Sequence, residues 1–278
     1  MRAMRIDTLR CCENRTRLVG MLFDWIRNHR RQKLLESPFA ESWLAALPTW
    51  VPVSVRLPDE VRRHWLELVQ VFVAEKNWQG GGGLEIDDEI RVTVAGYACL
   101  LILGLPHFFY ENVETIVVYP STVSAPVRQL GIFEQSLVPV PSEGRALLGE
   151  AHLRGPVILV WDAVRRGRHP ERGHNVVLHE FAHKLDMLDG RADGAPPLHD
   201  TADYERYAEV CHKEFATLQH AARTGTRTFL DHYGATNEAE FFAVATEFFF
   251  DEPERMRKKH PDLFDVLAHF YLVDPGNW

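Results

Sequence analysis

The segment HEFAHKLD, residues 179–186, lies inside an apolar stretch with helical spacing, and it decides how the rest of the chain is interpreted. Two residues that are four positions apart on a helix are separated by about 40° around its axis. His179 and His183 can therefore direct both imidazoles towards one metal ion, and Glu180 lies beside them, within reach of an attacking water molecule. This spacing is typical of hydrolytic zinc sites when the segment is helical.

The surrounding sequence favours a metal over a chance pair of histidines. Residues 175–188 are largely apolar and are expected to form a mostly buried helix. Two imidazoles and a carboxylate in such a helix would be costly to bury unless a partner satisfies them. We therefore predict that His179 and His183 are metal ligands. Glu180 is then the general base, which takes a proton from water and later delivers it to the leaving amine.

A hydrolytic zinc site takes three protein ligands and leaves one position for water, so a third ligand must come from elsewhere in the chain. The best source is the expected helix at 237–250, where Glu240 and Glu247 are two turns apart on one face. Spacing leaves two alternatives open for Glu240, which is either the ligand or the partner of Asn237 in a capping box. Glu247 is then either the ligand itself or a hydrogen-bond partner of a ligand.

Two further residues are candidates for supporting roles. Asp186 follows His179 by two helical turns and can accept the outer N–H of a ligand histidine. The alternative is an acid on the helix surface near the C-terminus, where the helix dipole disfavours it. Tyr233 precedes Glu240 by seven residues at the end of a loop. Its hydroxyl can donate a hydrogen bond to a developing oxyanion, although most loop tyrosines pack or bond locally.

Composition and charge limit the classes of partner. With 278 residues and 46% hydrophobic content, the chain can bury a sizeable core without a metal or disulfide. The formal net charge of −8 disfavours direct binding of nucleic acid, which requires a basic face. Residues 1–33 are nevertheless basic, with nine Lys or Arg against three acids. We interpret this arm as a solvated, partly disordered tail rather than a contact for an acidic partner or a membrane.

The cysteines and the apolar runs indicate a cytoplasmic protein. The four cysteines have neither the spacing of a disulfide framework nor that of a zinc ribbon. The arginine-rich start is not followed by an apolar run of signal-peptide length. The sequence contains no stretch of about 20 apolar residues, which is the length that a membrane-spanning helix needs.

Helical periodicity dominates the chain, and we predict a helix-rich α+β fold with a small mixed sheet. Besides 175–188 and 237–250, helices are expected at 42–47, 57–76, 87–104, 204–223 and 261–271. Strands are expected at 113–119 and 156–161, with one or two more near 136–140. Residues 80–83 and 165–173 are interpreted as loops, the first being a glycine connector rather than a phosphate loop. We expect one domain at 21–278, with an N-terminal helical part at 21–105, preceded by the tail at 1–20.

Two sequence blocks together carry a resemblance to a known family. HEFAHKLD and the segment YGATNEAEFFAVATEFFF, residues 233–250, resemble the Mlc titration factor A family of bacterial zinc peptidases. PVILVW at 156–161 and FYLVDP at 270–275 are also similar to it, whereas the basic residues 1–20 are not matched.

The resemblance implies a zincin-like fold with a gluzincin-type site, in which a downstream glutamate completes the two histidines around one zinc ion per chain. That glutamate corresponds to Glu240. The site is also similar to that of the lethal-factor metalloprotease, in which a tyrosine precedes the glutamate by seven residues. Here this residue is Tyr233, and the resemblance implies its role at the oxyanion.

The resemblance further implies aminopeptidase-type hydrolysis of short peptides, with a peptide as substrate. It also implies binding to the repressor Mlc, which controls sugar-uptake genes. We expect the strand at 157–161 to edge the cleft and to pair with the substrate backbone. The alternative function is that of a non-catalytic protein that sequesters an Mlc-like repressor and uses zinc as a structural feature.

Overall fold

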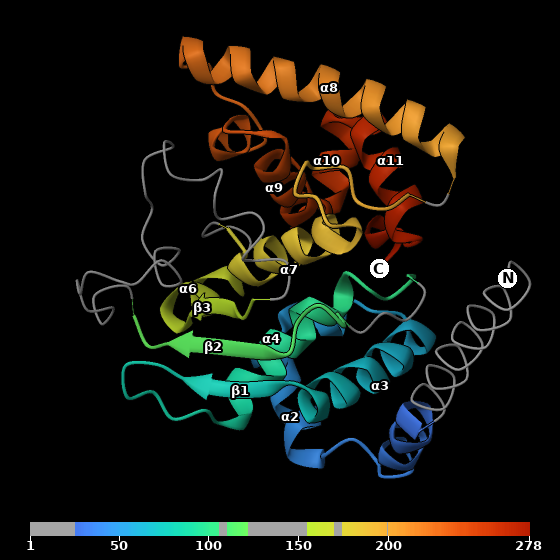
Figure 1. The fold of residues 1–278 in the computed structure, drawn as a ribbon, viewed down its shortest axis with the longest axis vertical. Coiled ribbons are helices and arrows are strands. Elements are labelled where there is room, and N and C mark those ends of the chain that lie inside the picture. The colour runs from blue at the N-terminus through green and yellow to red at the C-terminus, as the bar shows by residue number, and fades with distance from the viewer. Residues whose placement is uncertain (1–25, 106–109, 122–154, 170–173, 199) are drawn as a thin grey trace, which may run out of the picture. The chain divides into compact units, whose positions relative to one another are not determined.

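The structure, a computed structural model, describes residues 26–105, 110–121, 155–169, 174–198 and 200–278 (Figure 1). The chain divides into two compact units, Met1–Ala40 and Glu41–Trp278. In the first unit, residues 26–35 are helical. The predicted tail at 1–20 lies outside the described residues, and the single domain at 21–278 stays a prediction.

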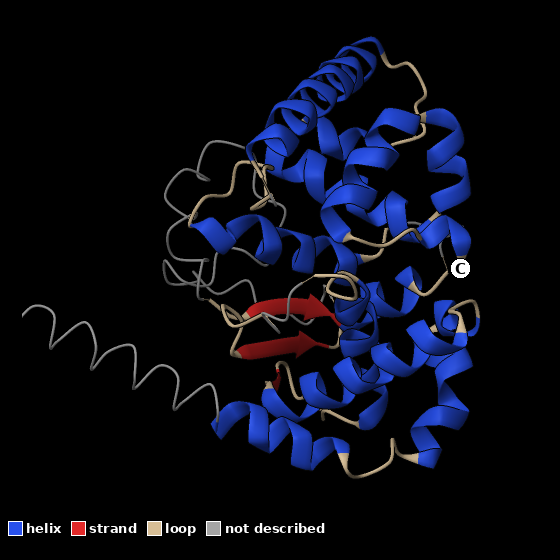
Figure 2. Cartoon of the chain, turned by 90° about the vertical axis from the view of Figure 1, so that its right-hand side faces the viewer, coloured by secondary structure: helices blue, strands red, loops and turns tan. Residues whose placement is uncertain are grey.

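Helices make up most of the second unit (Figure 2). The longer ones are α2 (Glu41–Trp50), α3 (Asp59–Glu75), α4 (Asp88–Leu100), α6 (Trp161–Gly167), α7 (Val176–Asp186), α8 (Thr201–Thr224), α9 (Glu238–Asp251), α10 (Pro253–Lys259) and α11 (Pro261–Tyr271). Short 3-10 turns occur at η1 (Pro52–Val55), η6 (Met187–Asp189), η7 (His232–Ala235) and η8 (Pro275–Asn277). The helix-rich α+β class is therefore confirmed.

The sheet of the second unit has three described strands, β1 (Asn77–Gly80), β2 (Thr115–Tyr119) and β3 (Val157–Val160), in the order β1-β2-β3. Both pairs are parallel. Parallel neighbours require a crossover connection, and the connection between β1 and β2 contains helix α4. The described strands thus pair only in parallel, whereas a mixed sheet was expected. The further strands predicted near 136–140 lie outside the described residues.

Short elements account for the main differences from the predicted secondary structure. No strand was predicted at β1, and its last residue, Gly80, was interpreted as part of the glycine connector at 80–83. Asparagine and glycine disfavour strands, and this segment is a strand because it pairs with β2. Residues 165–167 were expected to belong to a loop, but they form the end of α6. An ion pair between Asp162 and Arg165, at 2.7 Å, supports this helix.

Proline marks the other two differences. The helix predicted at 42–47 continues through Pro48 to Trp50 as α2, and the N–H of Val51 still donates to the Leu47 carbonyl at 2.8 Å. A short helix that was not predicted, α10, begins at Pro253, because a missing N–H has no cost at the first position of a helix.

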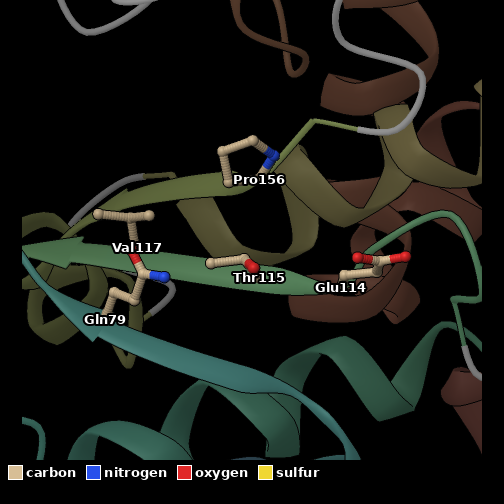
Figure 3. Close-up of a pocket in the computed structure, with 5 residues that line it drawn as sticks. All are labelled: Gln79, Glu114, Thr115, Val117 and Pro156. Carbon is tan, nitrogen blue, oxygen red and sulfur yellow. The ribbon is translucent and has the colours of Figure 1, made fainter.

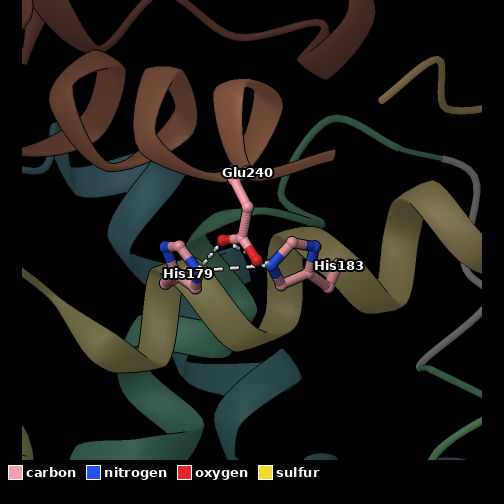
Figure 4. A group of neighbouring side chains, drawn as sticks. All are labelled: His179, His183 and Glu240. Atoms are coloured by element: carbon pink, nitrogen blue, oxygen red, sulfur yellow. Dashed lines mark hydrogen bonds and ion pairs between the residues drawn. The ribbon is translucent and has the colours of Figure 1, made fainter. Parts of the chain in front are cut away.

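Aromatic packing on one side fixes the helix that carries the HEFAHKLD segment. Phe181 of α7 makes edge-to-face contacts with Phe72 and Tyr110, at ring-centroid distances of 5.7 and 4.8 Å. The Tyr110 hydroxyl donates to the Ala98 carbonyl of α4 at 2.8 Å, so this cluster joins α3, α4 and α7. Helix α7 also packs against α9, towards which its histidines point (Figures 1 and 4).

A pocket lies over the sheet (Figure 3). It is lined by Gln79, Glu114, Thr115, Val117 and Pro156. None of these residues belongs to the predicted metal site, so the pocket is a separate feature. Among the described residues, no helix combines the length and the apolar character needed to span a bilayer.

Candidate metal centre

The three predicted ligands converge between α7 and α9 (Figure 4). The Nε2 atoms of His179 and His183 are 3.2 Å apart. The Oε2 atom of Glu240 lies 3.1 Å from the Nε2 of His179 and 3.5 Å from that of His183. In a tetrahedral zinc site with bonds of about 2.0–2.1 Å, neighbouring ligand atoms are about 3.3–3.4 Å apart. The donor set therefore fits one face of a zinc tetrahedron, and no second such group occurs in the part of the chain that the structure describes.

Asparagine caps begin both of these helices. The Asn175 side chain accepts from the N–H of Leu178 at 3.2 Å, and the Asn237 side chain accepts from the N–H of Glu240 at 2.9 Å. Asn237 thus caps α9, as the capping-box alternative expected. The carboxylate of Glu240 nevertheless faces the imidazoles, so capping by Asn237 and ligation by Glu240 do not exclude each other.

Glu247 lies behind His179. Its Oε1 is 2.7 Å from the Nδ1 of His179, and its side chain is buried. A carboxylate that accepts the outer N–H of a ligand histidine fixes the tautomer in which Nε2 is free to bind metal. Of the two roles that spacing left open for Glu247, the geometry favours the hydrogen-bond partner.

The electrostatics of the site favour a positive charge between these carboxylates. Burial alone would lower the pKa of His179, but hydrogen bonds with Glu240 and Glu247 raise it from 6.5 to about 10. Burial likewise opposes ionisation of Glu240, yet its hydrogen bonds with His179 and His183 hold its pKa well below the ordinary value. The pKa of Glu247 is also lowered, because the neighbouring imidazole of His174 and the hydrogen bond with His179 outweigh its burial. A proton or a metal ion can supply the charge that these groups attract.

Asp186 is fully buried at the end of α7 and bonds a backbone amide rather than an imidazole. Its Oδ2 accepts from the N–H of Gly194 at 3.0 Å, while its Oδ1 has no hydrogen-bond partner among the described residues. Burial raises the pKa of Asp186 to about 7. The hydrogen bond to a ligand histidine that we predicted for Asp186 is thus replaced by one to Gly194, and Glu247 makes the histidine contact.

Glu180 and Tyr233 both lie at the site. Glu180 is half-buried on α7, and its charge contributes to the raised pKa of His179. Tyr233 belongs to η7, and its ring centroid is 5.9 Å from that of His179. Its side chain remains 45% exposed, so it is accessible to a ligand. The catalytic roles of these two residues stay predictions.

The sequence did not point to His174, which joins the site from the loop before α7. Its Nδ1 lies 3.6 Å from the Oε2 of Glu247, and its Nε2 lies 3.5 Å from the Oδ2 of Asp231. The neighbouring carboxylate of Glu247 raises the pKa of His174, even though partial burial lowers it. Its partners are distant in sequence, so no local spacing could have revealed this contact.

The sequence analysis also assigned no role to Lys184. It follows His183 directly, is buried, and donates from Nζ to the Gly155 carbonyl at 3.1 Å. Burial lowers the pKa of Lys184 to about 8. The presence of a lysine within an apolar helix could have identified Lys184 from the sequence. Its hydrogen bond with Gly155 connects α7 to the residues just before β3.

Comparisons with known proteins extend over the whole of this site. A model of the family described as glucose-regulated metallo-peptidase M90 matches residues 25–272. An uncharacterised protein of Synechocystis sp. is 34% identical over 254 residues, which cover 91% of this chain and 90% of the relative. Mlc titration factor A of Cronobacter sakazakii is 30% identical over 240 residues, or 84% of this chain and 86% of the relative. The Mlc titration factor A of Salmonella arizonae is also 30% identical, over 84% of this chain and 92% of its own length.

Proposed function

Since the chain belongs to the glucose-regulated metallo-peptidase family M90, we propose that it hydrolyses peptides with one zinc ion held by His179, His183 and Glu240. The observation that carries this proposal is the convergence of two Nε2 atoms and one Oε2 atom at 3.1–3.5 Å from one another. A set of two imidazoles and one carboxylate is typical of catalytic zinc sites, which keep a fourth position for water.

Each residue around the three ligands would have its own role in hydrolysis. Zinc in such a site polarises the substrate carbonyl and lowers the pKa of the attacking water. Glu180 accepts the proton of that water and passes it to the leaving amine. The Tyr233 hydroxyl donates a hydrogen bond to the oxygen on which negative charge develops. Glu247 holds His179 in the tautomer that leaves its Nε2 free.

We propose short peptides as the substrate class, cleaved from a free amino terminus. Among the described residues, no strand pairs with the outer edge of β3, the last strand in the order of the sheet, and an extended peptide could pair there. The Lys184 contact to Gly155 holds the start of this strand beside the helix that carries the histidines.

A second candidate function is the binding of an Mlc-like repressor. It is supported by the name of the relatives from Cronobacter sakazakii and Salmonella arizonae, which is Mlc titration factor A. Repressor binding and hydrolysis can coexist on one chain, and a chain that only sequesters the repressor would use zinc as a structural feature.

The purified protein is expected to contain one zinc ion per chain and to hydrolyse short peptides. Elemental analysis measures the metal, and release of the first residue from peptides with a free or an acetylated amino terminus measures activity and its direction. A chelator should abolish hydrolysis, and added Zn²⁺ should restore it. Protein without stoichiometric metal would contradict the peptidase proposal, whereas cleavage of both peptides alike would contradict only the aminopeptidase part.

Zinc binding is expected to release a proton near neutral pH. In the metal-free protein the pKa of His179 is about 10, so its imidazole is charged at pH 7.5 and must lose that proton to bind metal. The apparent zinc affinity should therefore fall about tenfold for each unit by which the pH is lowered. The same raised pKa stabilises the metal-free fold below pH 6.5, and this contribution is lost as the pH rises through 10.

Calorimetric titration of Zn²⁺ in two buffers of different ionisation enthalpy counts the released protons directly. Competition with a chelator of known proton affinity at several pH values gives the slope. An affinity that does not change with pH would show that His179 is already neutral in the metal-free protein.

A further inference from the structure

The loop between α7 and α8 makes a buried contact with each of these helices through a single residue, Gly194. Its N–H donates to the Oδ2 of Asp186 at 3.0 Å, and its carbonyl accepts from the Tyr207 hydroxyl at 2.8 Å. All of these atoms lie in the interior, since Asp186 is fully buried and Tyr207 is nearly so. We call this group of Asp186, Gly194 and Tyr207 the clasp.

Gly194 also lies directly on the first turn of α9. A Cβ atom on Gly194 would be 2.3 Å from the Glu238 carbonyl oxygen and 3.0 Å from the Ala239 nitrogen, both of them backbone atoms. The residue has a φ of +74°, which glycine adopts without strain and other residues adopt rarely. The clasp therefore touches the backbone of α9 at the two residues that come before Glu240.

We propose that Asp186 is a positioning residue that acts through Gly194 to set the distance between the Glu240 carboxylate and the two histidines. This inference rests on the proposed function, in which Glu240 is the third zinc ligand. Helix α7 carries both histidines and Asp186, so a single rigid helix presents two ligands and also locates the support for the third. Leaving the Oδ1 of Asp186 buried without a partner has a cost. The clasp gives a reason for keeping a hydrogen-bond acceptor at this buried position.

An alternative role for Asp186 is electrostatic, because its charge can stabilise His183 as a ligand. Substitution by asparagine separates the two roles. The asparagine side chain would retain an oxygen that can accept from the N–H of Gly194 but would carry no charge, whereas alanine would remove both. If the clasp positions Glu240, Asp186→Asn should keep the zinc affinity within about threefold and Asp186→Ala should lower it about tenfold or more. If charge were the function, both variants would bind zinc equally weakly.

The glycines of the loop provide a matched pair for the steric contact. Gly190 has a φ of +92° and no heavy atom within 4 Å of its would-be Cβ, so Gly190→Ala introduces only backbone strain. Gly194→Ala introduces similar strain and, in addition, a collision with α9. We expect Gly194→Ala to weaken zinc binding about tenfold or more and Gly190→Ala to leave it within about threefold. Equal effects would mean that the contact with α9 is irrelevant.

The measurements use the full chain and do not depend on turnover. Zn²⁺ affinity is obtained by chelator competition, and the visible spectrum of Co²⁺-substituted protein reports whether the metal remains tetrahedral. Amide hydrogen exchange of the metal-free protein reports the order of the first turn of α9, which should exchange faster in Asp186→Ala but not in Asp186→Asn. If Asp186→Ala or Gly194→Ala fails to fold, Tyr207→Phe takes its place, because it removes only the hydroxyl that donates to Gly194. It should lower the zinc affinity and speed the hydrogen exchange of α9 to a smaller extent.

Failure of this inference is distinguishable from failure of the proposed function. If the wild type binds no zinc, the proposed function fails, and hydrogen exchange of the metal-free variants still tests the clasp. If the wild type binds zinc while Asp186→Ala and Gly194→Ala leave both the affinity and the exchange of α9 unchanged, the clasp does not position Glu240 and the inference is overturned.

Discussion

Glu180→Gln is expected to abolish peptide hydrolysis while the protein keeps its zinc. Glutamine has nearly the shape of glutamate, but its amide cannot accept the proton of the attacking water. General-base catalysis contributes about 10²–10⁴-fold to the rate, so kcat/KM should fall within or beyond this range. Glu180 is not one of the three converging ligand residues, so the zinc content should remain at the wild-type value.

Zinc content by elemental analysis and kcat/KM on a short peptide check this expectation in the same sample. The control is Glu238→Gln, which makes the same chemical change at an exposed position on α9 and should leave both values unchanged. Full turnover in Glu180→Gln would remove this residue from the mechanism. The variant also separates the two proposed functions, because sequestration of a repressor would continue without turnover.

Glu240→Ala is expected to lose zinc, and hydrolysis with it. Loss of a hydrogen-bond partner behind a ligand already costs about 10–100-fold in metal affinity, so loss of a ligand should cost more than about 100-fold. Glu238→Ala is the matched control, since it removes the same side chain two residues earlier, where it is exposed. Chelator competition measures the zinc affinity of both variants, and circular dichroism verifies that their total helix content matches that of the wild type.

A third variant makes this experiment decisive about the identity of the ligand. Glu247→Ala removes the carboxylate that holds the Nδ1 of His179 and should weaken zinc binding less than Glu240→Ala does. The reverse order would make Glu247 the third ligand, which is the alternative that helical spacing left open.

The local parts of the site were predictable because they depend on residues close in sequence. Helical periodicity and two asparagine caps define α7 and α9, and the spacing of His179 and His183 needs only one helix. The choice of Glu240 was beyond such reasoning, because its partners are about sixty residues away and meet it only through the packing of two helices. The resemblance to a known family implied Glu240, and the structure places its Oε2 atom 3.1 and 3.5 Å from the two Nε2 atoms.

The features that the sequence did not indicate depend on tertiary contacts. Strand β1 exists because β2 pairs with it, and the role of His174 arises from Glu247 on another helix. The contact of Asp186 with Gly194 belongs to the same class, since a loop must return to the end of α7 to make it. Helical geometry placed Asp186 correctly at the end of α7 but could not identify its partner.

The aromatic packing of Phe181 has a consequence for how the protein responds to the supply of metal. The histidines share α7 with a side chain that Phe72 and Tyr110 hold in the core, so the position of this helix does not depend on a bound ion. The proposed zinc ion could then enter and leave a chain that stays folded, unlike in zinc fingers, which unfold without metal. If both proposed functions hold, metal starvation would stop hydrolysis reversibly while the surface offered to a partner protein persisted, so the cell could withdraw one activity and retain the other.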